Sequence, residues 1–188
     1  MTGSWVGDGH RLPPPRPVSV RREIDPRGEP TWGLTTPGRW GEALRQAMKA
    51  WDAEEVPIGA VIVHEGHILS RGFNQVEMLK DATAHAEMLA LTAAEEAFGN
   101  WRLTGCTLYV TKEPCPMCAG AIVNCRIDRV VFGASDPKYG AAGGAMNLLQ
   151  HDGLNHTSSI TSGVGEKQCS TVLREFFAEQ RTKKAEKY

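Results

Sequence analysis

The spacing of apolar residues along the chain changes near residue 39. Residues 1–38 are rich in Pro, Gly and Arg and keep no hydrophobic period, so we expect an extended or flexible N-terminal arm there. From Trp40, apolar side chains recur at helical spacing through Leu44 and Met48 to Trp51, which predicts an amphipathic helix with two buried tryptophans. We therefore predict one folded domain over residues 39–188.

Apolar runs of strand length alternate with helical patterns through this domain. The nearly continuous apolar run at 56–63 predicts a buried strand, and after a turn at 64–66 residues 67–73 predict its hairpin partner. Further strands are expected at 107–111, 129–134 and 158–161. Helical patterns cover 84–98, with Thr83 or Asp81 as the cap, 117–124, a short stretch at 146–150, and a C-terminal segment that contains Cys169 and Phe176.

This order of elements predicts the fold class. A strand, a helix and another strand in succession imply a parallel pair with a right-handed crossover, whereas the hairpin is antiparallel. We therefore predict an α/β protein, a three-layer α/β/α sandwich with a mixed sheet of about five strands and helices on both faces.

Composition narrows the classes of function. The 188 residues are 41% hydrophobic and 23% charged, with a net charge of −1, which argues against a broad sequence-blind nucleic-acid surface and against DNA as a partner. A small site for single-stranded RNA stays open. No apolar run is long enough for a transmembrane helix or a signal peptide, and five cysteines, an odd number, make a disulfide framework unexpected. We expect a protein of the reducing cytoplasm without membrane contact.

The segment His85-Ala86-Glu87 and the later segment Pro114-Cys115-Pro116-Met117-Cys118 carry the candidate chemistry. A catalytic zinc ion takes three protein ligands and leaves a position for water, and His85, Cys115 and Cys118 supply three. Zinc can lower the pKa of its water from about 15.7 to about 7, and Glu87 would move protons between the water, a ring nitrogen and a leaving amine. Together the two segments form the signature of zinc-dependent deaminases.

Three other interpretations share parts of this pattern. The Cys-x-x-Cys pair alone is also found in structural zinc sites and redox pairs. A non-catalytic, zinc-stabilised RNA-binding module would need a fourth ligand from Cys106, Cys125 or His64, although these cysteines, like Cys169, lie in apolar patterns typical of core thiols. A deaminase of free guanine, cytosine or a nucleoside would share every zinc residue.

Over residues 39–182 the chain resembles the tRNA-specific adenosine deaminases of the TadA type. The resemblance rests on 55–61, 83–87, 107–111, 113–121, 129–134 and 153–156. It implies a cytidine deaminase-like fold, one Zn²⁺ per subunit, and hydrolytic conversion of adenosine to inosine at the wobble position of a tRNA anticodon, usually in an arginine tRNA. It also implies a homodimer whose active site borders the partner subunit and binds the anticodon stem-loop.

The same resemblance assigns roles to residues around the metal site. It implies a nucleoside contact by Asn74, a pocket wall that includes Ala86, an anticodon-facing loop with Asp136 and Lys138, contacts near the flipped nucleotide by Asn155 and His156, and stacking and phosphate contacts of the last helix by Phe177 and Arg181. The chain departs from the family at Ala82, where Pro is usual, and at Tyr139, where a small residue or Thr is usual. The accepted loop sequence therefore stays open.

Overall fold

The structure, a computed structural model, describes residues 36–186. Its elements in chain order are α1 (Thr36–Asp52), β1 (Gly59–His64), β2 (His67–Phe73), α2 (Val76–Leu79), α3 (Ala86–Phe98), β3 (Cys106–Lys112), α4 (Pro116–Asn124), β4 (Arg129–Ala134), β5 (Ser159–Thr161) and α5 (Glu166–Ala185). The predicted arm lies almost entirely outside the described residues. The first helix begins at Thr36, just before the predicted domain boundary.

The five strands form one mixed sheet in the order β2-β1-β3-β4-β5. Strand β1 pairs antiparallel with β2 and β3, whereas β3 with β4 and β4 with β5 are parallel. The predicted hairpin, crossover and fold class are therefore confirmed. Because β3 and β4 are parallel, both carboxyl ends, paired at Lys112 and Ala134, lie at the same edge of the sheet.

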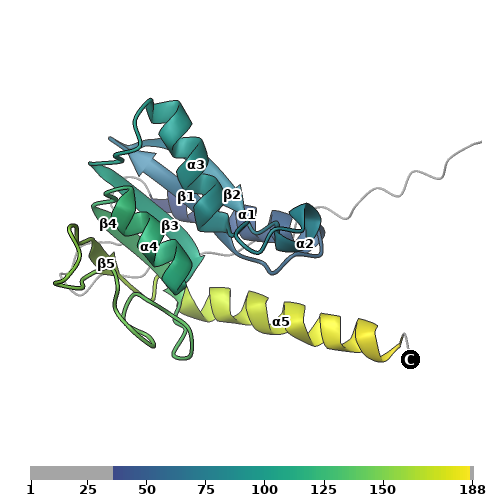
Figure 1. Cartoon of the computed structure of the whole chain (residues 1–188). Helices are drawn as coiled ribbons and strands as arrows, with labels where there is room; N and C mark the ends of the chain where they lie inside the picture. The colour runs from purple at the N-terminus through teal and green to yellow at the C-terminus, as the bar shows by residue number, and fades with distance from the viewer. Residues whose placement is uncertain (1–35, 187–188) are drawn as a thin grey trace, which may run out of the picture.

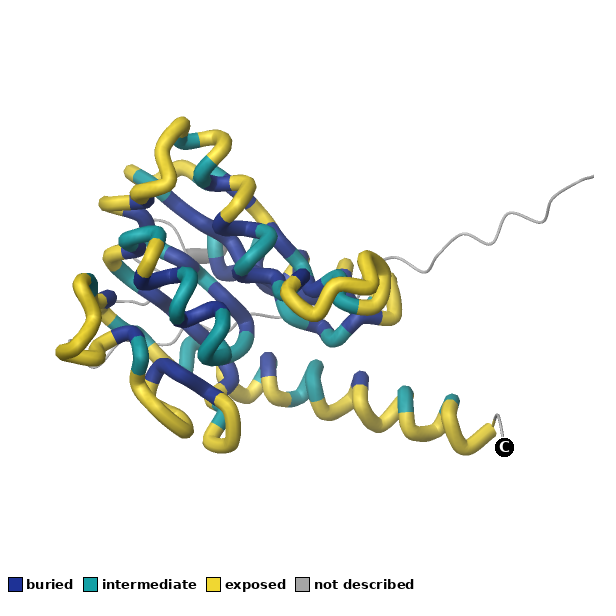
Figure 2. The backbone as a smooth tube through the Cα atoms, in the orientation of Figure 1, coloured by how far each residue is buried: buried dark blue, intermediate teal, exposed yellow. Residues whose placement is uncertain are grey.

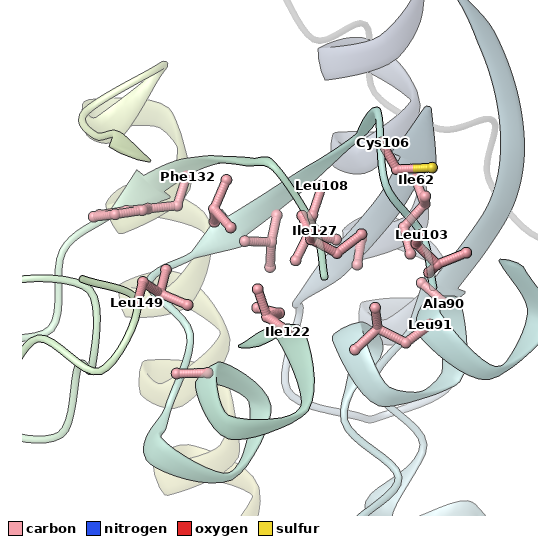
Figure 3. Close-up of a cluster of buried hydrophobic side chains, with 14 of the residues drawn as sticks. Ile62, Ala90, Leu91, Leu103, Cys106, Leu108, Ile122, Ile127, Phe132 and Leu149 are labelled. Carbon is pink, nitrogen blue, oxygen red and sulfur yellow. The ribbon is translucent and has the colours of Figure 1, made fainter. Parts of the chain in front are cut away.

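Helices cover both faces of this sheet (Figure 1). Helices α3 and α4 enclose the larger core with β1, β3 and β4, where Ile62, Leu108 and Ile122 are fully buried (Figure 3). Helices α1 and α5 cover the other face through Trp40, Leu44 and Cys169. The sheet is thus the middle layer, with α3 and α4 on one face and α1 and α5 on the other, as the three-layer prediction requires.

Two glycines let helices approach the edge hairpin from opposite sides. A Cβ on Gly59 of β1 would lie 2.1 Å from the carbonyl oxygen of Ala43 in α1. A Cβ on Gly72 of β2 would lie 2.3 Å from the carbonyl oxygen of Ala86 in α3. Backbone contacts this close are possible only where the strand has no side chain. Gly72 thus holds the first turn of α3, which contains Glu87, directly against the sheet.

Several local predictions were wrong. The stretch 146–150 is not helical: Ala142 and Asn147 form an isolated bridge, and the N–H groups of Ala145 and Met146 both donate to the carbonyl oxygen of Gly140. The loop folds back on itself because its backbone donors find partners inside the loop, and the apolar Leu149 is buried in the main core instead of lying on a helix. The run at 56–63 becomes a strand only from Gly59, since Pro57 has no N–H to donate.

The start of α3 and the segment before it also differ from the prediction. Neither Asp81 nor Thr83 caps α3, whose N-cap is His85. Instead the carboxylate of Asp81 accepts hydrogen bonds from the N–H and hydroxyl of Thr83, which closes a local turn. The short helix α2 was not predicted, because four residues are too few to show a hydrophobic period.

Helix α5 is exposed along most of its length, with its buried positions on the side that faces the body of the protein (Figure 2). Only Cys169 and Phe176 are buried among its residues. Within residues 36–186, no helix is both long and apolar enough to cross a bilayer.

Candidate metal centre and active site

Two helices begin at predicted metal ligands. His85 is the N-cap of α3 and has an extended backbone (φ −70°, ψ 153°), and Cys115 is the N-cap of α4 (φ −75°, ψ 171°) with Pro116 following at the first helical position. Because His85 precedes the helix, it need not share a helical face with Glu87, which lies in the first turn. The extended residue therefore lets two neighbours in sequence serve one site.

The three predicted ligands meet in space. Their donor atoms all lie within 4.8 Å of one another, and Nδ1 of His85 is 3.6 Å from Sγ of Cys115 and 3.5 Å from Sγ of Cys118. With usual Zn–S and Zn–N bond lengths, a tetrahedral ion separates such N and S ligands by about 3.6 Å. The spacing and the donor types therefore fit a zinc ion bound by these three residues.

The electrostatics of the two thiols favour a cation. The hydrogen bond between the thiols lowers the pKa of Cys115 to about 4, assisted by His85 and opposed by burial. The same contact, together with burial, raises the pKa of Cys118. The Cys115 contact also raises the pKa of His85, against the effect of burial. Without an ion the pair thus holds one negative charge, and a metal is needed to stabilise both thiolates.

Glu87 lies beside the three ligands without belonging to their group. Its side chain is buried, with 4% of the residue exposed, and burial raises the pKa of its carboxyl group. A carboxyl group whose pKa is shifted toward neutrality can both accept and donate a proton at physiological pH. The position suits the predicted acid/base role.

The candidates for a fourth ligand lie elsewhere. Among residues 36–186, His85, Cys115 and Cys118 form the only group of three or more His, Cys, Asp or Glu side chains placed to share an ion. Cys125 donates to a carboxylate oxygen of Glu95, and the ring of His64 packs edge-on against Phe98. Burial raises the pKa of Cys106 to about 11, as expected for an inert core thiol. The described ligand set therefore leaves room for water.

The predicted nucleoside contacts flank the start of α3. Asn74 follows β2, and its side chain is buried, with Nδ2 donating to Oε2 of Glu55 at 3.0 Å. The backbone N–H of Met78 donates to the other oxygen of Glu55 at 2.7 Å. Ala86 is fully buried against Gly72. Glu55 thus fixes the orientation of the Asn74 amide, which leaves Oδ1 and one N–H of that amide for other contacts.

The predicted anticodon-facing loop begins directly after β4. Asp136 pairs with Lys112, and its Oδ1 accepts the backbone N–H groups of Lys138 and Tyr139 at 3.0 and 3.1 Å. Burial alone would raise the pKa of Asp136, but Lys112 and the N–H groups of Lys138 and Tyr139 together lower it. Lys138 and Tyr139 are exposed, and Tyr139 has 60% of its surface accessible. The carboxylate of Asp136 is therefore a structural acceptor that holds the backbone of two exposed residues in place.

Of the remaining predicted contacts, Asn155 and His156 lie away from the ligand cluster of the same chain, and Phe177 and Arg181 lie on α5. Nε2 of His156 lies 2.8 Å from the carbonyl oxygen of Ile127, and Arg126 donates to the carbonyl oxygen of Asn155. Ile127 precedes β4, so both residues lie at the opposite end of that six-residue strand from Asp136. Phe177 is 44% exposed and packs edge-on against Phe176, and Arg181 is exposed further along α5.

Comparison with known proteins identifies the family. The MafB19-like deaminase family matches residues 39–181. The chain is 53% identical over 143 residues to a tRNA-specific adenosine deaminase of Bacillus subtilis (strain 168), which covers 76% of this chain and 89% of that relative. The chain belongs to the tRNA-specific adenosine deaminase family. The family predicted from the sequence is confirmed.

Solved structures agree with this assignment. A structure from a study of A-to-I editing by tRNA:A34 deaminases at the wobble position of transfer RNA is 41% identical, with a TM-score of 0.69, and covers 71% of this chain and 97% of that chain. A guanine deaminase from Bacillus subtilis is 38% identical, with a TM-score of 0.51, but covers 54% of this chain and 66% of that chain. The tRNA deaminase structure therefore matches more of the chain.

The hydrogen-bonding roles of two buried carboxylates of this deaminase were not predicted from the sequence. Glu55 orients Asn74, and Glu113, which is 3% exposed, accepts three backbone N–H groups from the loop after β4. The available signal was an acidic residue directly before Pro114-Cys115, followed later by a loop rich in Gly and Ala. Buried carboxylates need several donors, and a loop of small residues can bring its backbone N–H groups close to them.

Zinc affinity should depend on pH through two ligand protons. Cys118 and His85 both have raised pKa values, so below the His85 pKa metal binding must displace both protons, and above it only that of Cys118. The logarithm of the association constant should therefore rise with pH with a slope of about two, falling to about one. Chelator competition measures this, with Cys118→Ser as the variant that should lose one unit of slope. An affinity independent of pH would contradict the ligand assignment.

Proposed function

We propose that this chain converts adenosine to inosine at the wobble position of a tRNA anticodon, by zinc-dependent hydrolysis that releases ammonia. The observation that carries the proposal is the cluster of His85, Cys115 and Cys118 with the buried Glu87 beside it, in a member of the tRNA-specific adenosine deaminase family. The same activity was predicted from the sequence, and the similar protein of Bacillus subtilis is a tRNA-specific adenosine deaminase. An arginine tRNA is the expected substrate.

The chain supplies a metal site and a proton carrier. His85, Cys115 and Cys118 would hold one zinc ion per subunit, which when bound makes water a nucleophile at neutral pH. Glu87 would take one proton from the attacking water and pass it to the purine ring nitrogen N1, which keeps it in inosine. It would then carry the second proton of that water to the amine, which leaves C6 as ammonia. The buried setting of Glu87 limits competing exchange with solvent and raises its pKa, so the protonated form is accessible during the reaction.

The flanking segments are suited to an unpaired nucleotide. Taking a base out of an anticodon loop costs less than taking it from a duplex. Asn74, held by Glu55, would contact the flipped nucleoside beside Ala86, while Asp136 positions Lys138 and Tyr139 toward the rest of the loop. On α5, the exposed Phe177 and Arg181 would provide base stacking and a phosphate contact.

A homodimer accounts for the placement of Asn155 and His156. Both contact residues that precede β4, whereas the loop near the metal ligands of their own chain follows the other end of that strand. They would reach a bound nucleotide only at the active site of a second copy. We therefore propose a cytoplasmic homodimer in which each subunit completes the RNA-binding surface of its partner.

A purified sample should deaminate adenosine in an anticodon stem-loop and not as the free nucleoside. The assay incubates the zinc-loaded protein with an arginine-type stem-loop, free adenosine, guanine and cytidine, and follows adenosine loss and inosine gain. The loop contacts contribute binding energy that free adenosine lacks, so we expect turnover with the stem-loop alone. Turnover of free guanine or cytidine with none of the stem-loop would replace the proposal with a free-base or nucleoside deaminase.

The Glu87→Gln variant should keep one zinc per chain and lose about 10²- to 10⁴-fold in kcat, because a glutamine amide cannot carry the proton. Metal content by mass spectrometry and single-turnover inosine formation measure the two properties. Glu95→Gln is the matched control, since Glu95 contacts Cys125 at the opposite end of α4 from the ligand Cys115. Normal turnover by the Glu87 variant would exclude Glu87 as the proton carrier.

A further inference from the structure

Glu113 joins the metal-ligand segment to the loop that follows β4. It directly follows β3 and precedes Cys115 by two residues. Its Oε2 accepts the backbone N–H of Asp136 at 2.7 Å, and its Oε1 accepts those of Ala142 and Gly144 at 2.9 and 2.8 Å. One buried carboxylate therefore ties together both ends of the segment 136–144.

The loop is shaped to enclose this carboxylate. A Cβ on Gly140 would lie 2.2 Å from Cδ of Glu113, and a Cβ on Gly144 would lie 2.6 Å from its Oε2. The N–H of Ala141 also donates to the carbonyl oxygen of Pro114 at 2.8 Å, next to Cys115. Glycine at these two positions thus allows the backbone to wrap around a charged group that water does not reach.

We propose that Glu113 is a positioning residue for RNA recognition, which holds the 136–144 loop so that Lys138 and Tyr139 face the substrate beside the metal centre. The inference rests on the proposed function for its substrate. Both oxygens of Glu113 are occupied by N–H groups of the loop. It acts through Asp136, whose N–H it accepts and whose own carboxylate then accepts the N–H groups of Lys138 and Tyr139.

One oxygen of Glu113 accepts a single N–H group and the other accepts two, so a substitution can weaken one end of the loop and spare the other. A glutamine at position 113 keeps one acceptor oxygen. Two of the three hydrogen bonds are retained when this oxygen faces the N–H groups of Ala142 and Gly144. Its amide nitrogen then faces the N–H of Asp136, so that one hydrogen bond is lost and two donors oppose each other. Glu113→Gln should therefore release the Asp136 end of the loop and keep the Gly144 end.

Residue-resolved amide hydrogen exchange and steady-state kinetics on the full-length zinc-loaded protein test this. In Glu113→Gln the Asp136 amide should exchange at least tenfold faster, while the amides of Ala142 and Gly144 stay protected. Zinc content and kcat should stay near wild type, and KM for the stem-loop should rise roughly tenfold, because the loop contributes binding rather than chemistry. Glu95→Gln should change none of these quantities.

The wild-type protein provides a measurement that does not depend on how well the variant folds. The amides of Asp136, Ala142 and Gly144 should exchange more slowly than that of Lys138, whose acceptor Asp136 is itself in an exposed turn. Equal exchange at all four amides, or a Glu113→Gln protein with unchanged exchange and KM, would overturn the proposal.

Loss of zinc and kcat in the Glu113→Gln variant would also overturn the proposal, by placing Glu113 in support of the metal ligands. A wild-type protein inactive on RNA would sink the proposed function but not the exchange result.

Discussion

The donor atoms of His85, Cys115 and Cys118 meet because α3 and α4 both begin at the end of the sheet where β2 and β3 finish. Strand β3 ends at Lys112, and the chain enters α4 through Cys115, while His85 leads into α3 on the same face of the sheet. Free N–H groups and the positive end of the dipole at a helix start favour thiolate. Gly72 holds the start of α3 against β2, so the imidazole and the thiols are placed by rigid elements instead of by flexible loops.

Buried carboxylates extend this order into the segments around the metal centre. A carboxyl group can be buried only when hydrogen bonds compensate for the lost solvation. Glu55 and Glu113 therefore each accept hydrogen bonds from neighbouring segments. Glu55 binds the Asn74 amide and the backbone of α2, and Glu113 binds the loop that follows β4. Glu87 is also buried, and burial raises the pKa of its carboxyl group, which suits that group to accept and donate a proton.

The sequence pattern predicted the elements that have a clear hydrophobic period and the metal site that has a specific set of ligand residues. The crossover between β3 and β4, the hairpin of β1 and β2, and the grouping of His85 with Cys115 and Cys118 followed from periodicity and from the types of ligand residue. The loop at 136–150 did not, because its shape depends on a single carboxylate distant in sequence and on the absence of side chains at Gly140 and Gly144. The extended backbone of His85, which lets it serve one site with Glu87, is typical of an N-cap residue, but the helical pattern at 84–98 placed His85 inside the helix.

X-ray absorption at the zinc edge of the purified protein is the most direct test of the metal centre. The account predicts one zinc per chain with two sulfur neighbours at about 2.3 Å, one imidazole nitrogen at about 2.0–2.1 Å, and a fourth, oxygen neighbour that an added anion can displace. A shell of four protein donors, such as three sulfurs and one nitrogen with no exchangeable oxygen, would contradict it and indicate a structural zinc site.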